Sequence, residues 1–262
     1  MQIKALSSSS KGNCICVTDD RTTVLLDMGL AKKTTEGLLA EIDRRPQDVD
    51  AIFITHEHSD HIKGLGVFLR KYPVPVYATA GTIEGIQNSP GLGKLPYELF
   101  HVIDSRQTVV LKDWQIRAVP VLHDAREPVV YRIDGADRSV GIITDLGTYD
   151  EELVAAFQGV SQLLIEANHD PNMLLVGTYP YALKRRILGD YGHLSNGSCG
   201  SLLNRLLHDG LQGIMLGHLS EENNYAALAY ETVRESIRLA DTPYGADDFL
   251  LKVAIPNGLT TF

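Results

Sequence analysis

The chain has 262 residues, 44% of them apolar, which is enough to bury a substantial core. Twenty-four basic and thirty-three acidic residues give a formal net charge of −9. This balance excludes the broad basic field typical of proteins that read nucleic-acid sequence, so any phosphate binding must be local. No run approaches the eighteen uninterrupted apolar residues of a membrane span.

The amino-terminal stretch MQIKALSSSSKGNC lacks the charged and apolar segments of a secretory signal. We therefore expect a cytoplasmic protein that does not contact a membrane. The three cysteines are an odd number, and Cys14 and Cys16 lie only two residues apart. This usage suits a reducing compartment better than a disulfide framework, so we expect Cys14, Cys16 and Cys199 to be buried apolar groups.

Short strands separated by clusters of Ser, Gly, Asn or Asp open the chain and indicate a meander. Strands and helices then alternate as far as a Gly/Pro-rich connection at 88–96. The predicted elements are strands at 1–7, 14–19 and 23–29, a helix at 32–45, a strand at 50–55, a helix at 64–72 and a strand at 74–79.

A second β-rich block follows the connection, and strands then alternate with helices again. This block predicts strands at 108–113, 114–123, 129–134 and 138–144, followed by alternating elements at 161–167, 202–210, 211–217 and 224–240. We expect the two blocks to pack as halves of one domain covering residues 1–262, in the α/β (α+β) class.

Four metal-ligand side chains lie within six residues, directly after the predicted strand at 50–55. These are His56, His58, Asp60 and His61 in the stretch THEHSDHIKG. Alternate side chains of an extended stretch share a face, so His56 and His58 can meet one ion. Asp60 and His61, past the bend, then face a neighbouring ion. A solvated turn gives no reason for this spacing, which therefore predicts two metal ions.

Three further candidate ligands each follow an apolar strand. His123 follows RAVPVL, Asp145 follows VGIIT, and His218 follows GIMLG. If these strands lie side by side in sheets, all three side chains emerge at one edge, where strand ends carry functional residues. Together with the four-residue turn, they give seven candidate ligands.

The turn His56-Glu57-His58-Ser59-Asp60-His61 resembles the HxHxDH motif of the metallo-β-lactamase-fold hydrolases, and the resemblance spans nearly the whole chain. It implies a four-layer αββα sandwich and two divalent ions. One ion would take His56, His58 and His123; the other would take Asp60, His61 and His218; Asp145 would bridge them. The same resemblance makes Asp27 a structural aspartate and Asp60 a catalytic residue. Glu57 receives no role.

The metal turn alone does not choose the substrate. A bridged pair of ions lowers the pKa of a bound water and stabilises phosphoryl displacement, and the same pair can attack a thioester or a lactam. A glyoxalase-II-like thioesterase or lactamase is therefore an alternative, and a non-catalytic adaptor is a third. Flavodiiron oxygen reductases usually carry a glutamate where this chain has His58, which disfavours redox chemistry.

The tetrapeptide GHLS occurs twice, at 192–195 and 217–220. His218 ends an apolar strand like the other ligands, whereas His193 follows the basic helical stretch 181–192 and precedes a helix capped by Ser195 or Asn196. We expect His193 to contact a phosphate oxygen or to protonate the departing alkoxide, with Glu166 as a residue that could orient it.

The segments LSSSSKGNC, LIEANHD and GHLSN resemble the small YycJ/WalJ-like members of the superfamily, which implies a 5′-to-3′ DNA exonuclease. Histidine and carboxylate ligands accept both manganese and zinc, so either ion could serve. An RNA-processing endonuclease or cyclic phosphodiesterase remains an alternative. The 72 residues between Asp145 and His218 cannot hold a β-CASP domain, and the 61 between His61 and His123 show no arm of the kind that grips transfer RNA.

Two local features are expected to position a nucleic-acid strand. Arg185 and Arg186 belong to the basic triplet before His193 and would contact phosphates, each adding salt dependence. Backbone N–H groups of the serine-rich turn would cradle a terminal phosphate. The predicted substrate-binding residues are Ser9, Ser10, Asn13, Arg185, Arg186 and Ser195. We expect His101, His169 and His208 to be ordinary polar residues, and the sequence does not predict an oligomeric state.

Overall fold

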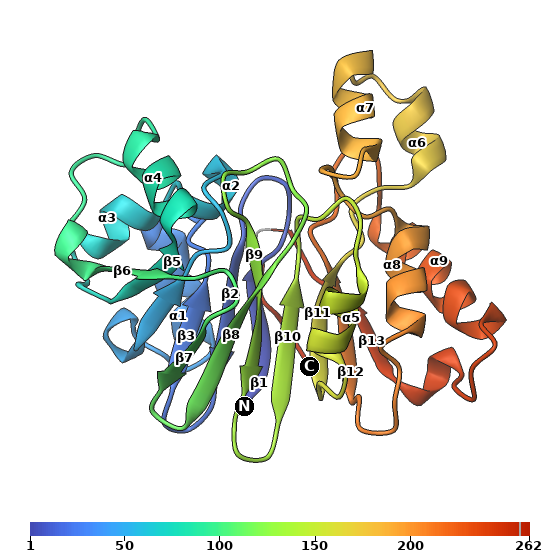
Figure 1. Ribbon diagram of the computed structural model, residues 1–262, viewed down its shortest axis with the longest axis horizontal. Coiled ribbons are helices and arrows are strands. Elements are labelled where there is room, and N and C mark those ends of the chain that lie inside the picture. Colours follow the sequence, from blue (N-terminus) through green and yellow to red (C-terminus); the bar gives the residue numbers. More distant parts are fainter. Residues whose placement is uncertain (257) are drawn as a thin grey trace.

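The computed structural model describes residues 1–256 and 258–262, in which two seven-stranded sheets pack face to face (Figure 1). The first sheet has the order β14-β1-β2-β3-β4-β5-β6. Its strands are β1 (Gln2–Ser7), β2 (Cys14–Thr18), β3 (Thr23–Leu26), β4 (Ala51–Phe53), β5 (Val76–Thr79), β6 (Phe100–Ile103) and β14 (Thr260–Thr261). Strands β1 to β3 are antiparallel neighbours, and β3 to β6 are parallel.

The second sheet has the order β13-β12-β11-β10-β9-β8-β7. Its strands are β7 (Thr108–Leu111), β8 (Trp114–Pro120), β9 (Val129–Asp134), β10 (Ser139–Ile143), β11 (Gln162–Glu166), β12 (Gly213–Gly217) and β13 (Leu250–Val253). Strands β10 to β13 run parallel, so their carboxyl ends meet at one edge.

Helices cover the outer face of each sheet (Figure 1). Helices α1 (Lys32–Glu41), α2 (Ser59–Ile62), α3 (Leu65–Leu69) and α4 (Ala80–Asn88) lie on the side of the first sheet. Helices α5 (Glu151–Phe157), α8 (Asn196–Asn204) and α9 (Ala226–Leu239) pack on the second. Helices α6 (Pro171–Val176) and α7 (Tyr181–Leu188) project beyond the strand ends.

Three hydrophobic clusters fill the spaces between four layers. One joins the first sheet to its helices, one lies between the sheets, and one joins the second sheet to its helices. Strand β11 shows how alternation produces this: Leu163 and Ile165 belong to the helix-side cluster, and Leu164 belongs to the cluster between the sheets. The predicted four-layer sandwich is confirmed.

Each predicted helix or strand is present as the predicted type of element, but some of its bounds differ. The helix predicted at 32–45 ends at Glu41, because the chain leaves helical geometry after Ile42 and turns through Asp43, which has a positive φ of 56°. The helix expected after Ser195 or Asn196 and the one predicted at 202–210 are a single helix, α8, which runs from Asn196 to Asn204. The hydroxyl of Ser195 accepts a hydrogen bond from the backbone N–H of Ser198 (3.1 Å), so Ser195 is the N-cap.

The predicted buried thiols are also confirmed. Cys14, Cys16 and Cys199 are free and fully buried. Burial is the main cause that raises the pKa of Cys16 to about 12, so this thiol stays protonated at neutral pH.

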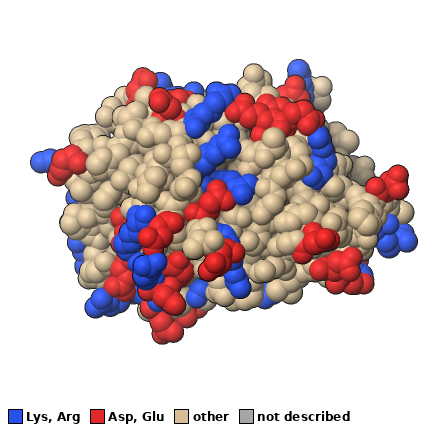
Figure 2. All heavy atoms as spheres, turned by 60° about the horizontal axis from the view of Figure 1, so that its bottom comes forward, with Lys and Arg blue, Asp and Glu red and all other residues tan. Residues whose placement is uncertain are grey.

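Acidic and basic side chains are interspersed on the surface opposite the α6 and α7 end of the sandwich. Figure 2 brings the bottom of Figure 1 forward and shows acidic and basic groups interspersed there, without a broad basic region. Among the described residues, no helix is both long and apolar enough to cross a membrane.

Candidate metal centre

All seven predicted ligands lie beyond the carboxyl ends of strands. His56, His58, Asp60 and His61 follow β4 of the first sheet, and the others follow β8, β10 and β12 of the second. The two sheets therefore contribute to one rim of the sandwich.

Backbone strain marks this rim. Asp27, Asp145 and His218 have positive φ values of 63°, 59° and 55°. Side chains other than glycine rarely adopt this left-handed conformation, which costs free energy unless the surroundings enforce it. Asp27 and His218 come immediately after β3 and β12, and Asp145 comes two residues after β10, so each lies in a turn at the rim.

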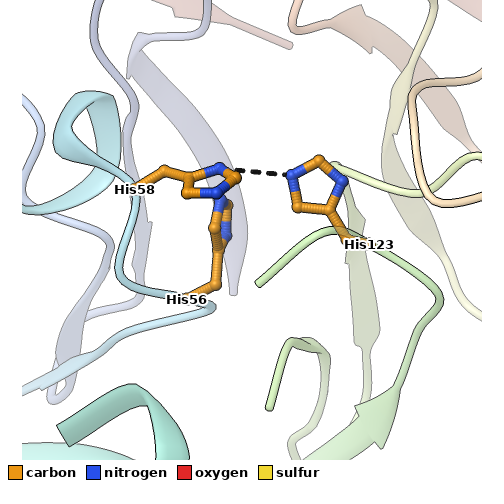
Figure 3. A group of neighbouring side chains, drawn as sticks. All are labelled: His56, His58 and His123. Atoms are coloured by element: carbon orange, nitrogen blue, oxygen red, sulfur yellow. Dashed lines mark hydrogen bonds between the residues drawn. The ribbon is translucent and has the colours of Figure 1, made fainter. Parts of the chain in front are cut away.

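The predicted ligands converge in overlapping groups whose donor atoms lie within 4.8 Å of one another. The groups are His56–His58–His123, Asp60–His61–His218, His56–His61–Asp145 and Asp145–Glu166–His193–His218. Figure 3 shows the first group, in which Nδ1 of His58 lies 3.3 Å from Nε2 of His123 across the gap between the two sheets. Four residues, His56, His61, Asp145 and His218, each belong to two of the groups, so the groups form one continuous cluster.

On the first sheet, hydrogen bonds to protein acceptors orient the histidine rings. Nδ1 of His61 donates to the carboxylate of Asp27 (2.8 Å). The hydroxyl of Thr55 also donates to Asp27 (2.9 Å), so its oxygen accepts from Nδ1 of His56 (3.0 Å). Nε2 of His58 donates to the carbonyl oxygen of Asp124 (3.2 Å). These bonds fix the tautomers and leave the opposite nitrogen of each ring as a potential ligand.

Hydrogen bonds to protein acceptors also orient the two histidine rings that follow strands of the second sheet. Nδ1 of His123 donates to the carbonyl oxygen of Gly192 (3.0 Å). Nδ1 of His218 donates to the carboxylate of Glu166 (2.8 Å). Nε2 of both rings therefore faces the centre, which is the arrangement typical of metal-binding histidines.

Several buried polar atoms at the centre have no hydrogen-bond partner among the described residues. They are Nε2 of His56, Nε2 of His218 and Oδ2 of Asp145. Buried polar atoms without partners are costly and rare in proteins, and a divalent cation would give all three a partner. The donor set of imidazoles and carboxylates fits such an ion.

The electrostatics of the cluster also favour a bound cation. Burial and three neighbouring imidazoles lower the pKa of His56, so its ring is neutral at pH 7. Burial opposes protonation of His218, but Asp145, Asp60 and Glu166 outweigh it and raise the pKa of His218 to about 10. The carboxylates thus create a strongly negative potential among the rings, which a divalent ion would balance.

Glu166 connects the two histidines of the repeated GHLS sequence. Its Oε1 lies 2.8 Å from Nδ1 of His193 and from Nδ1 of His218, and its Oε2 accepts from the backbone N–H groups of Leu146 and Leu194 (3.2 Å each). The two imidazole rings are stacked, with centroids 5.4 Å apart and ring planes inclined by 29°. One buried carboxylate therefore positions both rings.

The serine-rich loop lies against the Asp60 side of the centre. Ser9 and Asn13 are buried, and the side-chain oxygen of Asn13 accepts from the backbone N–H of Ser9 (3.0 Å). Nδ2 of Asn13 lies 3.2 Å from Oδ2 of Asp60 and 3.0 Å from Nε2 of His61. Of the predicted contact residues in this loop, only Ser10 is exposed.

The remaining predicted contact residues lie near His193. Arg186 forms an ion pair with Asp124, while Arg185 has no carboxylate partner among the residues described. The Ser195 hydroxyl caps α8. Lys184 donates to two backbone carbonyl oxygens, so among the described residues Arg185 is the cation of the triplet with neither a carboxylate nor a carbonyl partner.

Sequence reasoning missed two residues at the centre. Thr55 links Asp27 to His56, and Asp124 accepts from His58 and lies 3.5 Å from Nε2 of His123. Asp124 directly follows a predicted ligand, which was the only signal for it. Glu57, which received no role, points elsewhere and accepts from the backbone N–H of Arg126 (3.0 Å).

His169 differs from the expectation of an ordinary polar residue. Its side chain is buried, and both ring nitrogens have no hydrogen-bond partner among the described residues. Burial lowers the pKa of His169 to about 4, so the ring is neutral at pH 7.

Close packing behind Asp60 leads to a test by substitution. A Cβ on Gly29 would lie 1.6 Å from the carbonyl oxygen of Asp60. We expect Gly29→Ala to lower the free energy of unfolding by about 1–3 kcal/mol and to reduce metal binding, because Asp60 must move. Urea denaturation and metal analysis would measure both effects.

Gly37→Ala is the matched control, since Gly37 is exposed on α1 and a Cβ there meets no atom within 4 Å. It should raise stability by roughly 0.5–1 kcal/mol, because alanine favours helix. Equal destabilisation by both substitutions would contradict the packing argument.

Residues 22–209 match the family model described as "Beta-lactamase superfamily domain", and the chain belongs to this superfamily in its metallo-β-lactamase form. Within it, the chain is similar to exodeoxyribonuclease WalJ of Streptococcus pneumoniae serotype 2, at 41% identity over 92% of the chain and 90% of the relative. It is also similar to exodeoxyribonuclease YycJ of Bacillus anthracis, at 36% identity over 90% and 88%. The resemblance to the YycJ/WalJ group predicted from sequence is confirmed.

A solved structure supports the fold. The metallo-β-lactamase-fold protein YhfI of Bacillus subtilis aligns over 99% of this chain and 100% of its own, with a TM-score of 0.68 and 14% identity. At this identity the likeness concerns the fold alone.

Proposed function

We propose that this protein is a metal-dependent phosphodiesterase that degrades DNA as an exonuclease, in the 5′-to-3′ direction. The observation that carries the proposal is the pairing of a convergent ligand set with His193, a histidine beside it that the ligand set does not require. Similarity to the WalJ and YycJ exodeoxyribonucleases over about nine-tenths of the chain supports the choice of DNA.

We assign the ligands to two divalent ions. His56, His58 and His123 would hold one, Asp60, His61 and His218 would hold the other, and Asp145 would bridge them. Such a pair, of manganese or zinc, would supply an activated water at neutral pH and would stabilise charge on the phosphoryl group. Asp27 supports this set through His61 and Thr55.

His193 is the proposed proton donor to the departing 3′-oxygen. Its side chain is 14% exposed, and Nδ1 is bound to the buried carboxylate of Glu166. This bond leaves Nε2 as the nitrogen that can meet substrate. Asp60 would contribute to catalysis as one of the residues that hold an ion.

The substrate end would be held by groups around the rim. Ser10 and backbone N–H groups of the serine-rich loop would contact the terminal phosphate, and Ser9 and Asn13 would hold the loop in shape through their buried hydrogen bond. Arg185 and Arg186 would contact phosphates from the other side, near Ser195. We further propose that the protein acts in the cytoplasm, where its free cysteines stay reduced.

Two assays test the proposal. The manganese- or zinc-loaded protein should hydrolyse bis-p-nitrophenyl phosphate and leave an S-acyl glutathione intact; the opposite result would indicate a thioesterase. DNA and RNA strands labelled at either end should give single-nucleotide shortening from the 5′ end of DNA. Internal cuts in RNA would instead support an RNA-processing endonuclease.

A further inference from the structure

The segment between Glu166 and His193 projects from the sandwich as a pair of short helices, α6 and α7 (Figure 1). We define residues 171–192 as the α6–α7 arm. Its stretch 171–189 contains Lys184, Arg185 and Arg186 and no acidic residue, although the whole chain has a net charge of −9. The arm is therefore a local basic feature of an acidic protein.

The arm also exposes large apolar side chains. Tyr181 is 76% exposed and Tyr191 is 58% exposed. Leu175, Val176 and Leu188 are exposed as well. Isolated apolar residues are common on surfaces, but this concentration in one projecting segment indicates a binding surface.

The arm is anchored to the candidate metal centre at its base. The backbone N–H of Asp124 donates to the carbonyl oxygen of Tyr191 (3.1 Å), and the next carbonyl, of Gly192, accepts from the predicted ligand His123. Arg186 pairs with Asp124. The exposed ring of Tyr191 therefore belongs to a residue whose backbone contacts the loop that carries a ligand.

Two of the three arm cations have structural partners. Lys184 donates to the carbonyl oxygens of Leu175 and Gly177 (2.7 Å each) at the end of α6, and Arg186 pairs with Asp124. The guanidinium of Arg185 instead lies over the ring of Tyr181, 6.0 Å from its centroid. Arg185 and Tyr181 thus form an exposed pair of a cation and an aromatic face.

We propose that the α6–α7 arm is a stacking platform for a single-stranded DNA end, on which bases pack against Tyr181 and Tyr191 while Arg185 contacts the backbone. This inference rests on the proposed function. Exposed aromatic rings beside unpaired cations are the usual composition of single-strand binding surfaces, because every base has a π-face and every linkage a charge. A base-paired duplex hides its faces, so the platform selects unpaired ends.

The test measures binding without hydrolysis. A fluorescent 12-nucleotide phosphorothioate oligothymidylate is titrated with the metal-loaded full-length protein, and an abasic strand of the same length and charge is titrated in parallel. We expect the strand with bases to bind more tightly. Tyr181→Ala and Tyr191→Ala should each weaken that binding by about 5- to 100-fold and leave binding of the abasic strand unchanged.

Three variants sharpen the comparison. Tyr181→Phe keeps the aromatic face and should bind like wild type. Tyr97→Ala removes a tyrosine that is 48% exposed near β6, on the other sheet, and should also bind like wild type. Arg185→Ala should weaken both strands and reduce the slope of log affinity against log salt by about one.

Equal losses for both strands, or no loss in the tyrosine variants, would overturn the platform. The proposal would also be overturned if sedimentation showed that the protein is a dimer that Tyr181→Ala dissociates. Tight binding to anionic phospholipid vesicles, together with no preference for strands that carry bases, would overturn it as well. Base-dependent binding without any hydrolysis would reject the proposed function and keep the platform. If the tyrosine variants hydrolyse DNA and bind it like wild type, the proposed function is kept and the stacking platform is rejected.

Discussion

Replacing His218 by alanine should remove about one equivalent of bound divalent metal and lower phosphodiesterase turnover at least 10²-fold. The reason is geometric, because Nε2 of His218 is buried, has no hydrogen-bond partner among the described residues and lies 3.5 Å from the Asp145 carboxylate. Removing it breaks the Asp60–His61–His218 group. Metal analysis after gel filtration and turnover of bis-p-nitrophenyl phosphate would measure the two losses.

His193→Ala is the matched comparison, since both histidines bind the same carboxylate and both stand second in the tetrapeptide GHLS. It should keep the full metal content and reduce DNA turnover by roughly 10²-fold or more. A proton donor matters most for a basic leaving group, so the loss with bis-p-nitrophenyl phosphate should be much smaller. Equal metal loss in both variants, or equal turnover losses on both substrates, would refute the separate roles.

Replacing Glu166 should have the largest effect on stability. The buried carboxylate accepts from two imidazoles and two backbone N–H groups, and Glu166→Ala leaves these donors without a partner. We expect the free energy of unfolding at pH 7 to fall by about 3–5 kcal/mol. Urea denaturation would measure it, and a change below 1 kcal/mol would contradict the assigned network.

The effect of Glu166 should also depend on pH. Burial opposes ionisation, but His193 and His218 outweigh it and hold the pKa of Glu166 well below its usual range. A carboxylate whose pKa is depressed by folding contributes stability above its unfolded pKa, near 4.3, and loses it as the pH falls towards the folded value. The stability gap between wild type and Glu166→Gln should therefore be constant near neutral pH and shrink below about pH 4.

The ligand positions were predictable because strand ends share an edge. Asp145 and His218 each follow an apolar run, and parallel β10, β11 and β12 bring their ends together. The hydrogen bonds behind the ligands were not predictable. The bond from His123 to the Gly192 carbonyl joins residues 69 apart in sequence, and a backbone acceptor leaves no mark in the side-chain pattern.

The fold was predictable where apolar alternation is long. The predicted strands of both β-rich blocks are present, but β6, β13, β14, α2, α4, α5 and α6 were not predicted. These elements are short, and β6 and β13 expose part of their residues, so their patterns resemble loops. The burial of Ser9 and Asn13 could not be predicted either, because a polar loop that folds inward has the same composition as one that faces solvent.

The α6–α7 arm lies outside all three hydrophobic clusters. Substitutions of its exposed side chains leave the interior of the sandwich unchanged, so they should have little effect on the stability of the fold. Its base is different, since the Gly192 carbonyl holds His123. Over generations, such a chain is free to acquire new substrate preferences through the arm's outer half while its inner attachment stays nearly invariant.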